Sequence, residues 1–209
     1  MKQSTLPKIT KQDKIKYKDW WSALSDNWKK AINQAAFQKG EITDDLTIEE
    51  IHDLFHNSVA LRFAGPMAAY PNLTFEIGDL EGLKEIKSLK ILAVMNSNIT
   101  SLKPIANLTN LESLYVLDNA LKTLTGIEKL SNLKELNFQN NRVKSIEPLK
   151  KLTNLHTVSA VNNEIKSLKG LTEKHSKNLR NFYVLPNDKL PQKEIIRLEN
   201  KVGIRCLRG

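Results

Sequence analysis

A 22-residue period limits the possible folds of this chain more than any other feature of its sequence. Consecutive units share the pattern L-x-x-L-x-L-x-x-N-x-L, in which another apolar residue replaces some of the leucines. The units begin 22 residues apart, at Leu89, Leu111, Leu133 and Leu155. A unit this short cannot bury its own apolar face, so neighbouring units must stack and share one continuous core. The sequence therefore predicts a solenoid.

The spacing of apolar residues within each unit predicts its local structure. The L-x-L segment has period two, which indicates a short strand with alternate side chains buried. The apolar residues after it are three apart, as at Ile99, Leu102 and Ile105, and predict a tight 3₁₀-like or extended return. The ninth position carries a polar side chain that can bond to backbone groups freed where the chain leaves the strand. We expect these side chains to stack as an asparagine ladder, weaker at its serine end: Ser97, Asn119, Asn141, Asn163 and Asn187.

Several segments of the repeat carry a resemblance to a known family. The segments Leu108–Asn119 and Ser145–Leu155 resemble the 22-residue leucine-rich repeats of bacterial internalins, and Pro104 and Pro148 match the proline that this class has in its return. The resemblance covers roughly residues 73–207. It implies an α/β fold, a right-handed leucine-rich-repeat solenoid with parallel strands on its concave face. For function it implies a protein-binding scaffold and names no partner, because binding sites are grafted onto such folds.

An open solenoid exposes its core at both ends and needs caps there. We expect residues 18–57 to form a helical N-terminal cap, and the lysine-rich residues 1–17 to form a basic, flexible tail. The three tryptophans of the chain recur at helical spacing, in an amphipathic helix or helix pair that ends near Gly40, and we interpret them as core. Thr47 and Glu50 match a capping box that opens a further helix.

The repeat array is expected to occupy residues 58–209. Leu61 and Phe63 alternate like the buried pair of a first strand, so the first unit has 31 residues instead of 22. Its extra residues form an apolar insertion, Ala64–Asn72, between strand and return.

The C-terminal end of the array is expected to close the solenoid. The unit that starts at Leu179 is followed by a short helix over Pro191–Lys201. Ile204 and Cys206 stand 22 residues after the buried pair of that unit, and predict a last strand. Counted this way, the array has seven parallel strands.

Side chains that could carry chemistry are few. His52 and His56 are four residues apart on an expected helix, as in a zinc motif, but Asp53 replaces the motif's glutamate and no third ligand is evident. The sole cysteine, Cys206, falls on a core position, and the eight glycines are scattered and form no phosphate-binding loop. We therefore predict a non-enzymatic protein with no catalytic residue, cofactor or metal site.

Positive charge is concentrated in the repeats. The formal net charge is +9, while residues 1–61 carry nine lysines and nine acidic residues, so the excess lies beyond them. Lys122, Lys144 and Lys166 share one position of the repeat and should form a column where the strands end. This column supports an alternative function, a basic adaptor that binds nucleic acid or an anionic surface. No aromatic residue interleaves these lysines for base stacking, so we do not favour nucleic acid.

The concave side of the predicted sheet is the candidate site. Of fifteen positions that should face outward there, only Glu135 is charged, although 26% of the whole chain is charged. Exposed apolar residues together with tyrosines are typical of protein-binding surfaces. We therefore predict a protein-interaction module, and the insertion, with Met67 and Tyr70, is a candidate extension of the same face. The predicted partner-binding residues are Ile91, Met95, Tyr115, Leu117, Glu135, Asn137, Gln139, Ser159, Val161, Tyr183 and Leu185.

Location is less constrained by the sequence. No stretch approaches the ~18 consecutive apolar residues of a membrane span, and the Met1–Tyr17 segment lacks the apolar core of a signal peptide. With one cysteine the chain forms no internal disulfide, which is compatible with a reducing compartment. Unless a signal has been removed, these features favour a cytoplasmic location, and we expect a monomer.

Overall fold

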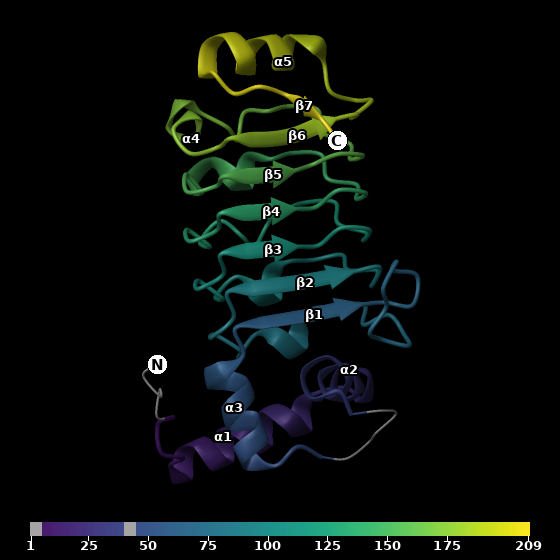
Figure 1. Ribbon diagram of the computed structural model, residues 1–209, viewed down its shortest axis with the longest axis vertical. Helices are drawn as coiled ribbons and strands as arrows, with labels where there is room; N and C mark the ends of the chain where they lie inside the picture. The colour runs from purple at the N-terminus through teal and green to yellow at the C-terminus, as the bar shows by residue number, and fades with distance from the viewer. Residues whose placement is uncertain (1–5, 40–44) are drawn as a thin grey trace.

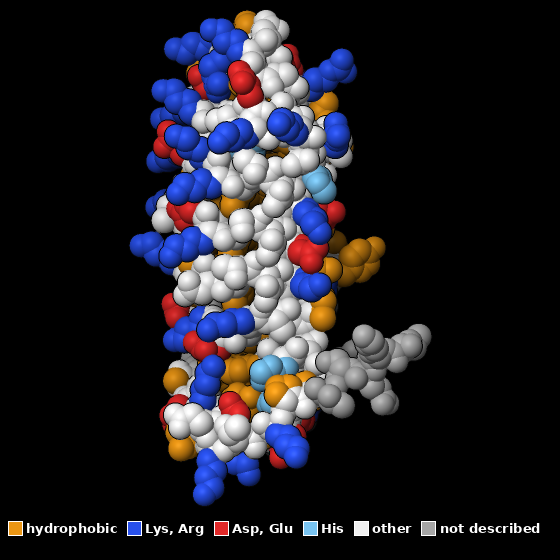
Figure 2. Space-filling model, turned by 90° about the vertical axis from the view of Figure 1, so that its left-hand side faces the viewer, with side chains coloured by type: hydrophobic (Ala, Val, Ile, Leu, Met, Phe, Trp, Pro, Cys, Tyr) orange, Lys and Arg blue, Asp and Glu red, His pale blue; other side chains and the backbone are white. Residues whose placement is uncertain are grey.

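The computed structural model describes residues 6–39 and 45–209, which form a stack of strands with helices at both ends (Figure 1). The stack is long and narrow, extended in the direction in which the strands succeed one another (Figure 2). Within the described residues the strands form one seven-stranded parallel sheet in sequence order, which confirms the predicted number and direction of the strands. They are β1 Ala60–Ala64, β2 Ile91–Met95, β3 Ser113–Tyr115, β4 Glu135–Asn137, β5 Thr157–Ser159, β6 Asn181–Leu185 and β7 Leu207–Arg208.

The register of the sheet follows the repeat. Leu92 of β2 pairs with Leu114 of β3, 22 residues later, and with Leu61 of β1, 31 residues earlier. The first unit is therefore the long one, as predicted. A one-residue slip would turn each buried leucine to the open side of the sheet, which is why the buried pairs fix this register.

The returns between strands close the core on the other side of the sheet. Three of them contain short 3₁₀ helices, η1 Glu81–Leu83, η2 Lys103–Ile105 and η3 Glu147–Lys151. Pro104 and Pro148 lie in the first turn of η2 and η3, where a missing N–H costs no hydrogen bond. The leucines and isoleucines that line the core from both sides are fully buried, and each contributes roughly 2 kcal/mol of transfer free energy.

The side chains of the expected asparagine ladder bond to backbone groups of their own and the preceding unit. Asn119 Oδ1 accepts from the backbone N–H groups of Ser97 and Ile99, at 3.2 and 3.0 Å, while Asn119 Nδ2 donates to Val94 and Leu117 carbonyls. The side chains at 141, 163 and 187 repeat this bridge to the preceding unit. Ser97 reaches no further than Met95 O, 3.0 Å away, which agrees with a weaker ladder at this end.

Two further roles of asparagine were not foreseen from the sequence. The residue that turns the chain out of each of the strands β2 to β5 has a left-handed backbone, with φ between 48 and 55°, which asparagine and aspartate tolerate best after glycine. These residues are Asn96, Asp118, Asn140 and Asn162. A second, more exposed ladder precedes the strands, in which each Nδ2 donates to a carbonyl of the preceding unit: Asn110, Asn132, Asn154 and Asn178.

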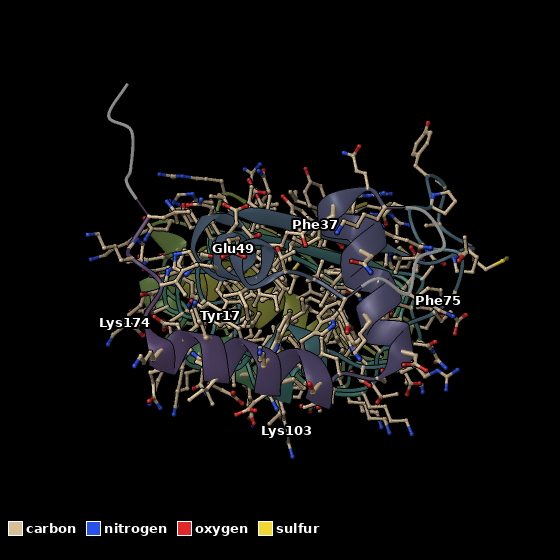
Figure 3. All side chains as sticks on the ribbon, turned by 90° about the horizontal axis from the view of Figure 1, so that it is seen from below. Tyr17, Phe37, Glu49, Phe75, Lys103 and Lys174 are labelled. Atoms are coloured by element: carbon tan, nitrogen blue, oxygen red, sulfur yellow. The ribbon has the colours of Figure 1, made fainter. Side chains whose placement is uncertain are left out.

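The N-terminal cap consists of α1 Lys11–Ala23, α2 Asp26–Phe37 and α3 Ile48–Asn57. Seen from below, these helices cover the end of the stack, and Tyr17 points inward from α1 (Figure 3). Trp20, Trp21 and Trp28 are buried, as expected for core residues. The predicted capping box of Thr47 and Glu50 is present at the start of α3.

One boundary of the cap needs correction. Residues 1–17 were expected to form a flexible tail, but α1 begins at Lys11 and Tyr17 is 1% exposed. The cause is a capping box in which Thr10 and Asp13 satisfy each other's backbone N–H groups. Residues 1–5 and the expected helix end at Gly40 lie outside the described residues. The division of the chain into tail, cap and array otherwise stays a prediction.

The C-terminal closure also differs in detail from the expectation. The short helix is present as α5 Gln192–Arg197, continued by a π-helical turn over Leu198–Val202, and it follows the single-turn α4 Glu173–Ser176. The last strand comprises Leu207–Arg208 instead of Ile204 and Cys206, and its pairing with β6 is irregular. The shift arises because Glu199 accepts from the Cys206 N–H at 3.0 Å and delays the strand. Ile204 is buried nevertheless.

Candidate functional site

The open side of the sheet is lined by the side chains on either side of each buried pair. We keep the name concave face for this surface, defined by the third, fifth and seventh positions of the repeat. Side chains alternate along a strand, so each buried leucine is flanked by two such residues. On this face Ile91 is 41% exposed and Glu135 is exposed, while Tyr115, Asn137 and most of the others are half-buried by their neighbours.

Val161 does not belong to the accessible part of this face. It was expected to be exposed, but it is 6% exposed in the structure. Gly209, which follows β7, lies against Val161 and the Tyr183 side chain and donates its backbone N–H to Leu185 O at 3.0 Å. The C-terminal strand therefore covers the upper end of the apolar row. Leu185 stays half-buried beside it.

A hollow of about 340 Å³ lies on the concave face between the two tyrosines of the fifth position. Tyr115 and Tyr183 form opposite ends of it, and Glu135, Asn137 and Ser159 line it between them. The hollow is thus bounded by two amphipathic rings, which carry both apolar area and a polar group. Its volume is at the small end of the range of ligand pockets.

Hydrogen bonds fix the polar centre of the hollow. The Tyr115 hydroxyl donates to a carboxylate oxygen of Glu135. Burial, and then this bond, raise the pKa of Tyr115 above its ordinary value, so the hydroxyl stays protonated at neutral pH. Ser159 Oγ donates to Gln139 Oε1 at 3.3 Å, and the Gln139 N–H donates to Asn137 Oδ1 at 3.1 Å. These side chains are therefore held in fixed positions by one another.

The insertion after β1 lies at the edge of the same face. Arg62, at the fifth position of β1, donates from its guanidinium to Tyr70 O and so ties the insertion to the concave face. Asn72 closes the loop, since its Oδ1 accepts from Ala64 N and its Nδ2 donates to Arg62 O, both at 2.7 Å. Met67 and Tyr70 are 78% and 82% exposed at its tip. Arg62 was not predicted as a site residue, since its strand lies outside the regular 22-residue period.

The two cap histidines are engaged with a tyrosine. The Tyr17 hydroxyl lies 2.8 Å from His52 Nδ1 and 3.4 Å from His56 Nε2, and the two imidazole rings are 4.5 Å apart. Among residues 6–39 and 45–209 no three His, Cys, Asp or Glu side chains are placed to share a metal ion. These histidines thus help to pack α1 against α3.

Cys206 is not set up as a nucleophile. It is half-buried and packs against the core. Burial, and then the nearby Glu199 carboxylate, raise the pKa of its thiol to about 12. A nucleophilic cysteine needs the opposite shift, toward the thiolate.

The lysine column of the alternative function is exposed. Lys122, Lys144 and Lys166 all lie on the surface beyond the strands. Lys189 pairs with Glu164 at 2.7 Å close to this column, and the hydrogen bond lowers the pKa of that carboxyl. This pair is neutral in itself and leaves the charge of the column in place. No helix in the described part of the chain is both long and apolar enough to cross a membrane.

Stacked parallel strands, short returns and an asparagine ladder define a leucine-rich-repeat solenoid with a helical cap. Residues 131–173 match the family model "Leucine Rich repeats (2 copies)". The fold is internalin-like, and proteins of this kind are generally binding modules without enzymatic activity. No curated protein matches the chain in a sequence search.

Three solved structures show the likeness, each with a TM-score of 0.54. Internalin C2 from Listeria monocytogenes is 21% identical, and the match covers 79% of this chain and 85% of that one. A second Listeria monocytogenes internalin is 23% identical over 78% of this chain, which spans 56% of the length of that protein. A leucine-rich-repeat protein from Leptospira interrogans is 25% identical, with 62% of this chain and 33% of that one covered. The confirmed resemblance is to bacterial internalin-like repeat proteins.

Proposed function

We propose that this chain binds a protein partner through its concave face, with the hollow between Tyr115 and Tyr183 as the main anchoring point. The observation that carries the proposal is the composition of this surface: apolar and aromatic side chains flank a hydrogen-bonded centre, and Glu135 is the charged residue on strands β2 to β6. Protein interfaces have this make-up, with aromatic anchors and few charges at the centre.

The part of the face near β2 would extend the contact. Ile91 is 41% exposed, and Met95 and Leu117 are half-buried next to it. The insertion adds Met67 and Tyr70 at the end of β1. A partner that fills the hollow and reaches the insertion would cover a continuous apolar strip, which is what stable recognition requires.

The test is quantitative capture of partners by the immobilised chain from a lysate of the source organism. We expect the double variant Tyr115→Ala and Leu117→Ala to lose the partner, because truncation of central anchors costs about 2 kcal/mol each, or roughly thirtyfold in affinity. The matched control is Lys122→Ala with Lys144→Ala, which removes two exposed side chains beside the concave face and should retain the partner.

The same experiment separates the alternative, an anionic partner held by the lysine column. Such binding would survive the Tyr115→Ala and Leu117→Ala double variant, would be lost in the lysine control and would fall steeply with added salt. That combination of results would refute the concave-face proposal.

A further inference from the structure

A second hollow, of about 650 Å³, lies away from the sheet at the C-terminal end of the stack. It is formed by η3, by the return that follows it in the next unit, by α4, and by α5 with its π-helical turn. Five cationic side chains line it: Lys150, Lys151, Lys169, Lys174 and Arg197. We call it the basic groove. Figure 2, seen from the side on which α4 lies, shows Lys and Arg side chains gathered over this upper part of the molecule.

The positive charge of the basic groove is largely uncompensated. Within the described residues none of its four lysines has a carboxylate within 4.0 Å, whereas Lys134 and Lys189 elsewhere in the stack have ion-pair partners at 2.6 and 2.7 Å. Glu173 is the one carboxylate among the described residues that line the groove. An excess of like charges around one hollow is unfavourable, and a bound anion would relieve it.

Arg197 is held in place by a neighbouring acid. Its guanidinium lies 3.5 Å from Glu194, whose Oε2 also accepts from Leu168 N at 2.7 Å and Ser167 Oγ at 3.1 Å. The Glu194 carboxylate therefore connects α5 to the preceding return through these hydrogen bonds.

The opposite wall is fixed by a buried histidine. His175 of α4 is fully buried, with Nε2 3.0 Å from Leu149 O of η3 and Nδ1 3.2 Å from the Thr172 hydroxyl. This bridge holds α4, with Lys174, against η3, with Lys150. The cations are thus presented on a preformed frame, which reduces the entropy lost when a ligand binds.

The floor of the basic groove is apolar. Val202 is half-buried at the bottom of the groove, above the fully buried Leu171, and is the apolar side chain that a ligand can reach there, together with the aliphatic stems of the lysines. A bare anion or a nucleic-acid backbone would leave such a floor uncovered, and no described residue lining the groove is aromatic, as base stacking would require. A peptide that places an apolar side chain on the floor and carboxylates against the lysines would satisfy both features.

We propose that the basic groove is a second binding site, independent of the concave face, for an acidic segment of a protein with an apolar anchor residue. Lys150 and Lys151 would contact carboxylates on one side, and Lys169 and Lys174 on the other. The exposed lysines attract the carboxylates of the peptide, and salt weakens this attraction. Contact of the anchor residue with the floor adds a hydrophobic contribution to affinity that salt does not screen.

Fluorescence anisotropy with a labelled synthetic peptide of alternating glutamate and leucine tests this proposal directly on the full chain. The groove variant is Lys150→Glu with Lys169→Glu, and the control is Lys122→Glu with Lys144→Glu, which makes the same change of net charge on exposed lysines outside the groove. We expect the groove variant to bind about tenfold more weakly than the control, since two attractive contacts become repulsive. Circular dichroism and melting midpoints confirm that both variants fold.

Three probes define the outcomes. A peptide with serines in place of the leucines should bind several-fold more weakly, and the concave variant Tyr115→Ala with Leu117→Ala should bind the acidic peptide like wild type. The proposal is overturned if both charge reversals weaken binding equally, since that would mean diffuse attraction. It is also overturned if the serine peptide binds as well, or if a single-stranded oligothymidine competes at lower concentration than the peptide. The binding of the acidic peptide to these variants does not depend on whether the concave face binds a partner, so the two proposals can fail separately.

Discussion

The buried asparagine ladder should contribute far more to stability than the second, more exposed ladder does. Asn163 is 9% exposed. Its Oδ1 accepts from Val143 N at 2.9 Å, and its Nδ2 donates to three carbonyls at 3.0 to 3.2 Å. In Asn163→Ala the three carbonyls would keep other donors, from Asn141 Nδ2, Asn187 Nδ2 and Asn140 N. The Val143 N–H, in contrast, would lose its hydrogen-bond acceptor, Asn163 Oδ1.

The magnitude follows from this difference. An orphaned buried N–H costs about 1–3 kcal/mol, and three redundant hydrogen bonds add roughly 0.5 kcal/mol each, so we expect a loss of about 3 kcal/mol. With a urea slope of about 2 kcal/mol/M, the unfolding midpoint should fall by about 1.5 M. Asn154→Ala is the matched control. It removes one exposed bond, from Asn154 Nδ2 to Ser131 O at 2.9 Å, and should cost about 1 kcal/mol or less.

Urea unfolding followed by circular dichroism measures both variants against wild type. If the two alanine variants lose the same free energy of unfolding, the buried N–H is not what makes the ladder costly to break. The reasoning would then be refuted, although the repeat fold itself would stand.

Two further predictions concern the core and the cap. Gly170→Ala should destabilise the chain by about 3 kcal/mol, because a Cβ there would lie 1.8 Å from Ile146 O, a backbone atom that cannot move aside. Thermal melting measures the effect, and Lys169→Ala is the surface control. Equal melting midpoints for the two variants would contradict the prediction. Burial, and then His52, lower the pKa of His56 below its ordinary 6.5. As pH falls, His56 therefore takes up a proton at a lower pH in the folded state than in the unfolded state. The stability that this difference contributes should be complete above pH ~6.5 and should decline as pH falls through the lowered pKa. Urea unfolding at neutral and mildly acidic pH should show a smaller decline in His56→Asn, and an unchanged decline would rule out this histidine as its source.

Local periodicity explains why the array was predictable. The strands, their register and the ladder depend on residues that recur with the unit and meet their own equivalents, so Leu92 and Leu114 specify each other's place. The second asparagine ladder recurs with the same period at Asn132 and Asn154, but its amides are exposed, so no burial pattern marks them as structural.

The ends of the chain were harder to predict because their structure depends on single contacts. The start of α1 was hidden by a lysine-rich sequence, although the spacing of Thr10 and Asp13 carried the capping-box signal. The burial of Val161 depends on Gly209, 48 residues later, and no local pattern encodes that contact. The position of β7 depends on one hydrogen bond to Glu199. Equally, the basic groove joins four segments, and composition alone shows only that lysines are abundant.

The one-dimensional build of the stack determines how its two proposed sites must be tested. Each unit contacts only its neighbours, so damage to one unit is expected to loosen the adjacent units before the rest. The hollow of the concave face reaches from Tyr115 to Tyr183, and the basic groove uses residues from Lys150 to Val202. The two sites therefore share the units on either side of Asn163. A core variant in this region, such as Asn163→Ala, should weaken binding at both sites together even if the sites are independent. Surface substitutions that leave the melting midpoint unchanged are consequently the ones that can separate a tyrosine-lined protein interface from a lysine-lined groove.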